Sequence, residues 1–81
     1  MPPSLSGKQV IALLRKDGWT EGGRTRHGVF LWKRFPGESI PRMTVVPDKS
    51  DALPDGTLGA ILGVKQTRLG KSGLLALIRK Y

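Results

Sequence analysis

The sequence predicts an α+β domain in which helices pack on one face of a three-stranded antiparallel sheet, in the order α-β-β-β-α with a further short helix. Apolar residues recur at helical spacing near both ends of the chain. Between them, over 19–47, short runs rich in aromatic and β-branched residues alternate with glycine and proline breaks, as in strands joined by tight turns. The 81 residues are enough for one domain, 1–81, so any site must lie on the surface of a single small core.

The first helix is predicted over 5–18, with a marked start and end. Ser6 and Gln9 fit the S-x-x-Q capping box, in which the hydroxyl accepts a free N–H of the first turn and the Gln side chain reaches back. Gly18 stands where a left-handed residue would end the helix. The apolar stripe that repeats at i, i+3 and i+4 is Val10, Leu13 and Leu14. One face of this helix is therefore expected in the core.

Three strands are predicted near 19–24, 28–35 and 40–46, with breaks at Gly22-Gly23 and Pro36-Gly37. Successive side chains of a strand point to opposite sides. One face of the middle strand carries Phe30 and Trp32, and the other carries His27, Val29, Leu31 and Lys33.

The two faces of the middle strand are assigned by size. Because Phe30 and Trp32 are the larger apolar pair, we expect them to face the helices. His27 and Lys33 would then lie on or near the open side of the sheet. Packing, and not base stacking, is the role expected of Trp19, Phe30, Trp32 and Phe35.

The second half of the chain is predicted to form a short helix and a final one. Asp55 is expected to be the N-cap of the short helix. The apolar stripe of that helix is Leu58, Ile61 and Leu62. The apolar cluster from Leu74 to Ile78 predicts the final helix, and Arg79 and Lys80 are placed to stabilise its negative C-terminal end.

The net charge of the chain points to a polyanionic partner. Fourteen Lys and Arg against six Asp and Glu give a net charge of +8. Nucleic acid is favoured over an anionic membrane because the basic residues are spread through the chain and do not line one helix face. Charge kept for solubility alone is the alternative. With no membrane span, no apolar leader and no cysteine, the expected location is the cytoplasm.

Metal and cofactor sites lack the residues that they need. The chain has one histidine and no cysteine, and its six acidic residues are scattered. It contains no G-x-S-x-G elbow, Walker A loop or G-x-G-x-x-G motif. We therefore expect no metal and no small-molecule cofactor.

The remaining candidate site is a basic cluster around His27. Its candidate RNA-phosphate contacts, expected close together in one sheet, are Arg24, Arg26, Lys33, Arg34 and Arg42. Metal-free RNA cleavage requires a base for the 2′-hydroxyl, cations for the phosphate and an acid for the leaving oxygen. An imidazole can do the proton transfers near neutral pH, and arginines can bind the phosphate. From the residues alone, a structural or simple RNA-contact role for His27 stays open beside the catalytic one.

A resemblance to a known family adds to this interpretation. The segments that carry it are Ser6-Gly7-Lys8 with Leu13-Leu14, Asp17-Gly18-Trp19, His27 followed by Val29-Phe30, Val45-Val46-Pro47, and Gly56-Thr57-Leu58-Gly59-Ala60-Ile61-Leu62. Together they resemble HicA, the toxin of HicA/HicB toxin–antitoxin modules. Members of that family have an α-β-β-β-α fold similar to the double-stranded RNA-binding domain.

The resemblance implies a function and a site. HicA toxins are taken to cleave messenger RNA, without a cofactor, through a histidine at the start of the second strand, and a HicB antitoxin protein neutralises them. His27 occupies the position of that histidine. Thr25-Arg26 stand where Gly-Ser is usual, and Gly28 follows where a second histidine or another residue often stands.

Three functional hypotheses follow. The first is a ribonuclease toxin with His27 as general acid or base and with Arg24, Arg26 and Lys33 on the scissile phosphate. The second is a non-catalytic RNA-binding module on the same fold. In the third, compatible with the first, the basic surface is the docking site of an acidic antitoxin that covers the neighbourhood of His27.

Overall fold

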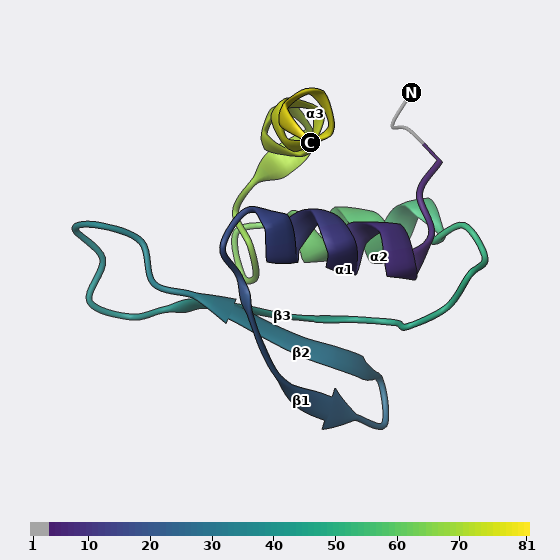
Figure 1. The fold of residues 1–81 in the computed structure, drawn as a ribbon, viewed down its shortest axis with the longest axis horizontal. Helices are drawn as coiled ribbons and strands as arrows, with labels where there is room; N and C mark the ends of the chain where they lie inside the picture. The colour runs from purple at the N-terminus through teal and green to yellow at the C-terminus, as the bar shows by residue number, and fades with distance from the viewer. Residues whose placement is uncertain (1–3) are drawn as a thin grey trace.

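The computed structural model describes residues 4–81 and has the predicted α+β architecture. Its elements, in chain order, are α1 (Gly7–Lys16), β1 (Thr20–Thr25), β2 (Gly28–Lys33), β3 (Arg42–Val46), α2 (Asp55–Ile61) and α3 (Gly70–Lys80). The three strands form one antiparallel sheet in the order β1-β2-β3. Helices α1 and α2 lie over the same face of this sheet, and α3 lies beyond them (Figure 1). None of the helices in the described part of the chain combines the length and apolar character needed to cross a membrane.

The capping pattern of α1 is confirmed. The backbone N–H of Gln9 donates to the Ser6 hydroxyl at 3.1 Å, and the Gln9 side chain accepts from the Ser6 N–H at 2.8 Å. After the C-cap Asp17, Gly18 adopts φ +96°, the left-handed conformation that turns the chain toward β1. The helix thus begins and ends where its sequence signals predict.

The prediction of which face of β2 is buried was wrong. Val29 and Leu31 face the helices, with exposed fractions of 1% and 0%, whereas Trp32 is 36% exposed on the open face. Phe30 shares that open face and packs against β1, where only a glycine fits: a Cβ at Gly22 would lie 2.5 Å from its ring. Side-chain size therefore does not select the buried face, because β1 offers the rings room on the open side.

The core lies between the sheet and the helices. Its buried apolar residues are Val10, Ile11, Leu14, Trp19, Val29, Leu31, Val46, Leu53, Leu58, Ile61, Leu62, Leu74 and Leu77. Trp19 packs edge-on against Phe35 with ring centroids 6.0 Å apart, so packing is confirmed for these two aromatic residues. Phe30 and Trp32 are the two that the prediction misplaced.

The start of α2 differs from the prediction, and the final helix is present. Pro54, not Asp55, is the N-cap of α2: the Pro54 carbonyl accepts the N–H of Leu58 at 3.0 Å, so Asp55 already lies inside the first turn. Helix α3 begins at Gly70, before the apolar cluster, and a Cβ at Gly73 would lie 2.9 Å from the Cβ of its N-cap residue Leu69. Arg79 and Lys80 occupy its last turn as predicted.

Candidate functional site

His27 lies in the tight turn between β1 and β2. Thr25 pairs with Gly28 across the hairpin, which leaves Arg26 and His27 as its two connecting residues. The Thr25 hydroxyl accepts the backbone N–H of His27 at 3.1 Å and donates to the Gly28 carbonyl at 3.2 Å. One hydroxyl therefore ties both sides of the turn and fixes the backbone that carries the histidine.

Gly28 is required by the backbone of this turn. Two-residue hairpin turns usually have positive φ at one or both connecting residues. Here Arg26 and His27 keep negative φ, and Gly28 takes φ +143° instead. A Cβ at this position would also lie 2.2 Å from the carbonyl oxygen of Val46. A second histidine at position 28 is thus incompatible with this turn.

The side chains at the turn are available to a ligand. His27 and Arg26 are both exposed. Within residues 4–81, no hydrogen bond reaches either ring nitrogen of His27, and Arg26 forms no ion pair. The imidazole is therefore accessible to a bound molecule, and none of the residues described orients it by a hydrogen bond.

Arg24 lies on the helix-facing side of β1 and is partly engaged. Its Nη1 atom lies 2.6 Å from Oδ2 of Asp48, and Oδ1 of the same carboxylate accepts from Lys8 Nζ at 3.0 Å. These two hydrogen bonds, first from Lys8 and then from Arg24, lower the pKa of Asp48 below its usual value. Arg24 still has 68% of its side chain exposed, so most of its donors face solvent.

Three predicted phosphate contacts lie far from His27. Lys33 is the last residue of β2, five residues beyond Gly28 or roughly 17 Å along the strand; Arg34 follows it, and Arg42 pairs with it from β3. The expectation that they would be close to His27 was therefore wrong. Closeness in the sequence hid this distance, because the turn and the open end of an antiparallel hairpin lie at opposite ends of its strands.

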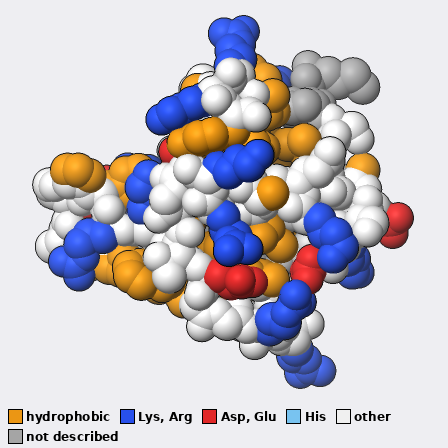
Figure 2. All heavy atoms as spheres, in the orientation of Figure 1, with side chains coloured by type: hydrophobic (Ala, Val, Ile, Leu, Met, Phe, Trp, Pro, Cys, Tyr) orange, Lys and Arg blue, Asp and Glu red, His pale blue; other side chains and the backbone are white. Residues whose placement is uncertain are grey.

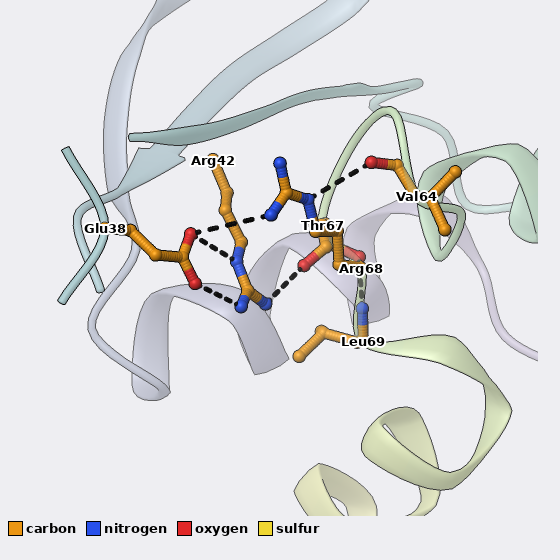
Figure 3. A network of polar contacts seen from close by, with 6 residues as sticks. All are labelled: Glu38, Arg42, Val64, Thr67, Arg68 and Leu69. Carbon is orange, nitrogen blue, oxygen red and sulfur yellow. Dashed lines mark hydrogen bonds and ion pairs between the residues drawn. The ribbon is translucent and has the colours of Figure 1, made fainter. Parts of the chain in front are cut away.

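Arg42 is engaged inside the protein (Figure 3). It donates from Nε and Nη2 to the Glu38 carboxylate at 3.1 and 2.6 Å, and from Nη1 to the carbonyl of Thr67 at 3.0 Å. Its guanidinium carbon lies 3.9 Å from the centre of the Phe35 ring. The Arg42 hydrogen bonds lower the pKa of Glu38, and Arg68 lies 3.9 Å from the same carboxylate. Arg42 thus joins the β2–β3 loop to the α2–α3 loop.

Lys33 is engaged in a similar way. Its Nζ donates to the main-chain carbonyl of Asp17 at 2.6 Å and lies 3.4 Å from the Asp17 carboxylate. The same ammonium lies 4.9 Å from the centre of the Phe35 ring. The expectation that Lys33 lies on the open face was wrong, because these contacts hold it on the helix side against the end of α1.

The sequence reasoning missed two basic residues that the fold brings to Arg24. Lys8 and Arg15, both on α1, line a surface groove of about 280 Å³ together with Arg24 and Asp48 of the sheet side. We call this hollow the α1–β1 groove. Lys8 and Arg15 are seven residues apart, which places them on one face of a helix, so the helical period could have grouped them. Nothing in the sequence shows that this face lies beside Arg24.

Comparison of the chain with family models, with curated proteins and with solved structures gives no match. In the described part of the chain, His, Asp and Glu form no group of three that could hold a metal ion.

Proposed function

We propose that the protein is the toxin of a type II toxin–antitoxin module: a cytoplasmic, metal-independent endoribonuclease that cleaves messenger RNA with His27. The proposal follows the resemblance to HicA. The order of elements, with α1 and α2 on one face of a three-stranded sheet, is compatible with it. We also propose, from this order, that the fold is related to the double-stranded RNA-binding domain.

The observation that carries the proposal is the exposed position of His27 on the β1–β2 turn. The only histidine of the chain stands at the exposed tip of a hairpin that Thr25 and Gly28 hold in shape. An imidazole in this place can accept the proton of a 2′-hydroxyl or donate one to the leaving oxygen. Positioned acid–base catalysis contributes about 10²- to 10⁴-fold in rate, which suits a slow toxin.

The cations available to the phosphate are Arg24 and Arg26. Both belong to the same hairpin as His27, and both side chains are exposed. Guanidinium groups bind phosphate oxygens through paired N–H donors, and they would stabilise the charge that develops during cleavage. Lys33 is left out of the proposed phosphate contacts, since it is held at the far end of β2 by the carbonyl of Asp17.

A non-catalytic RNA-binding module is the second candidate. One observation favours it: His27 has no hydrogen-bonding partner in residues 4–81 to orient its ring, whereas catalytic bases are commonly oriented by a neighbouring group. In this case the basic hairpin would bind RNA without cutting it. Binding would then depend on salt and not on His27.

The proposed antitoxin is a HicB-like protein with an acidic surface. A toxin that is lethal when free needs a partner that covers its site, and the net charge of +8 favours an acidic one. We expect the complex to bury the hairpin tip around His27. Full nuclease activity in a saturated complex would contradict this arrangement.

The deciding experiment incubates a long single-stranded RNA with the wild type, His27→Ala and His27→Gln in excess EDTA. We expect fragments from the wild type alone, because glutamine keeps a polar side chain but cannot exchange a proton near neutral pH. Cleavage by His27→Gln at the wild-type rate would exclude acid–base catalysis by this residue. Intact RNA in every lane, with a mobility shift in native gels, would favour the binding module.

A further inference from the structure

The α1–β1 groove holds an anion supplied by the protein itself. The carboxylate of Asp48 bridges Lys8 on α1 and Arg24 on β1, with contacts of 3.0 and 2.6 Å. Figure 2 shows Lys and Arg side chains spread over one face of the molecule, with acidic side chains between some of them. A phosphodiester offers the same kind of paired oxygen acceptors as a carboxylate.

The backbone around Asp48 is held in place. A Cβ at Gly7 would lie 1.7 Å from the Pro47 carbonyl oxygen, so only glycine allows α1 to start this close to the segment after β3. The Lys8 N–H also donates to the Lys49 carbonyl at 3.1 Å. The position of Asp48 is therefore built into the fold, and only its side chain needs to move for the carboxylate to leave the two cations.

The cations keep donors for a second anion. Lys8 and Arg24 have 56% and 68% of their side chains exposed, and each makes a single contact with the Asp48 carboxylate. Arg15 lines the same groove and forms no ion pair with any of the described residues. The apolar residues Ile11, Ala12 and Val29 complete the lining together with Glu21 of β1, so three cations face two carboxylates in the groove.

We propose that the α1–β1 groove is a phosphate subsite for an RNA strand, in which a phosphodiester displaces the Asp48 carboxylate from Lys8 and Arg24 and also contacts Arg15. The choice of RNA rests on the proposed function. Arg24 precedes His27 by three residues, at most roughly 11 Å of chain, so a strand cut at the hairpin tip has a neighbouring phosphate within reach of the groove. In this arrangement Arg26 serves the scissile phosphate and Arg24 the neighbouring one. Asp48 lowers RNA affinity in this arrangement, because a phosphate that enters the groove must compete with its carboxylate for Lys8 and Arg24.

The experiment measures binding of a fluorescent, 2′-O-methylated single-stranded RNA, which cannot be cleaved through its 2′-hydroxyl, by anisotropy at several salt concentrations. Asp48→Asn is compared with Asp51→Asn, which removes the same charge from an exposed residue of the same segment. We expect Asp48→Asn to tighten binding about fivefold more than Asp51→Asn at 0.1 M salt, the effect of one added phosphate contact on a single strand. Equal effects, or weaker binding by Asp48→Asn, would overturn the proposal.

A second pair of variants tests the cations of the groove while Asp48 itself is unchanged. Lys8→Gln and Arg15→Gln are each expected to weaken binding about fivefold and to reduce the slope of log K against log salt by about 0.7. Lys65→Gln, an exposed lysine in the α2–α3 loop, is the control for the lost charge. Losses no larger than that of Lys65→Gln would also overturn the proposal. Arg15 forms no ion pair in the described part of the chain, so its variant tests the groove even if Asp48→Asn unfolds.

The outcomes separate this subsite from the proposed function. If cleavage requires His27 but RNA affinity does not change in the groove variants, the subsite alone is overturned. Groove-dependent binding without any cleavage of ordinary RNA would overturn the nuclease and leave the subsite standing.

Discussion

The two ends of β2 carry similar numbers of basic residues but use them differently. At the end that joins β3, Lys33 and Arg42 are tied to carbonyl groups, carboxylates and the Phe35 ring. At the hairpin end, Arg26 and His27 are exposed and form no side-chain contact of this kind with residues 4–81. A count of cations along a strand therefore does not tell which of them can bind a ligand.

The difference has a physical origin in how each end is closed. The hairpin end is held without charged side chains, through the backbone of Gly28 against Val46 and through the Thr25 hydroxyl. The other end joins a longer connection to β3 and is closed by charged side chains instead, with Arg42 at its centre. Closing a loop by uncharged contacts leaves its charged side chains free for function.

The largest effect is expected when the backbone closure of the hairpin is broken. Gly28→Ala would force an alanine into φ +143° and place its Cβ 2.2 Å from the Val46 carbonyl oxygen. We expect the free energy of unfolding to fall by roughly 2–4 kcal/mol, from strain and overpacking together, in a denaturant titration. Gly37→Ala is the control, since Gly37 has φ +80° but no atom within 4 Å of the added Cβ. Equal losses in both variants would show that the contact with Val46 does not matter.

A smaller loss of stability is expected at the opposite end. Arg42→Ala removes the bonds to Glu38 and Thr67 and the contact with Phe35, and it leaves the Glu38 carboxylate without its main partner. We expect a loss of about 2 kcal/mol, or a fall in Tm of roughly 8–16 °C for a domain of this size, measured by circular dichroism. RNA cleavage below the new Tm should stay unchanged.

Arg34 provides the control for this variant. It follows Lys33 directly but is exposed and forms no hydrogen bond or ion pair in the part of the chain described. Arg34→Ala should change stability by less than about 0.5 kcal/mol. If Arg42→Ala were as mild as Arg34→Ala, the contrast between free and engaged cations would be lost.

RNA binding should be more sensitive to a cation at the hairpin end than to one at the far end. We expect Arg26→Gln to weaken the binding of uncleavable single-stranded RNA about fivefold at 0.1 M salt, the loss of one phosphate contact. Arg34→Gln removes the same charge roughly 17 Å further along the sheet and should have a smaller effect. Equal losses would mean that the bound strand runs along the whole of β2.

Much of the fold was predictable from local sequence chemistry, and the site only in part. The capping box at Ser6, the stop at Gly18 and the three strands depend on neighbouring residues, and all are observed. The buried face of β2 was not predictable, because it depends on Gly22 of the neighbouring strand β1, which leaves room for the Phe30 ring. The engagement of Arg42 by Thr67 depends on residues 25 positions apart, which no local pattern connects.

The smallest effect is expected from acid. Arg42 lowers the pKa of Glu38 in the folded protein below its ordinary value of 4.5. A carboxyl group with a depressed folded pKa stabilises the fold fully above its unfolded pKa, and this contribution is lost as the pH falls through the folded value. The Tm of the wild type should therefore drop more steeply below about pH 4.5 than that of Glu38→Gln, and the two proteins should converge at the acid end. Parallel curves from pH 7 to 2 would show that the Glu38–Arg42 pair does not stabilise the far end of the sheet. Asp48→Asn offers the matching test at the hairpin side. The pKa of Asp48 is lowered from an ordinary value of 3.8. The wild type should therefore begin to lose stability relative to Asp48→Asn at a lower pH than it does relative to Glu38→Gln.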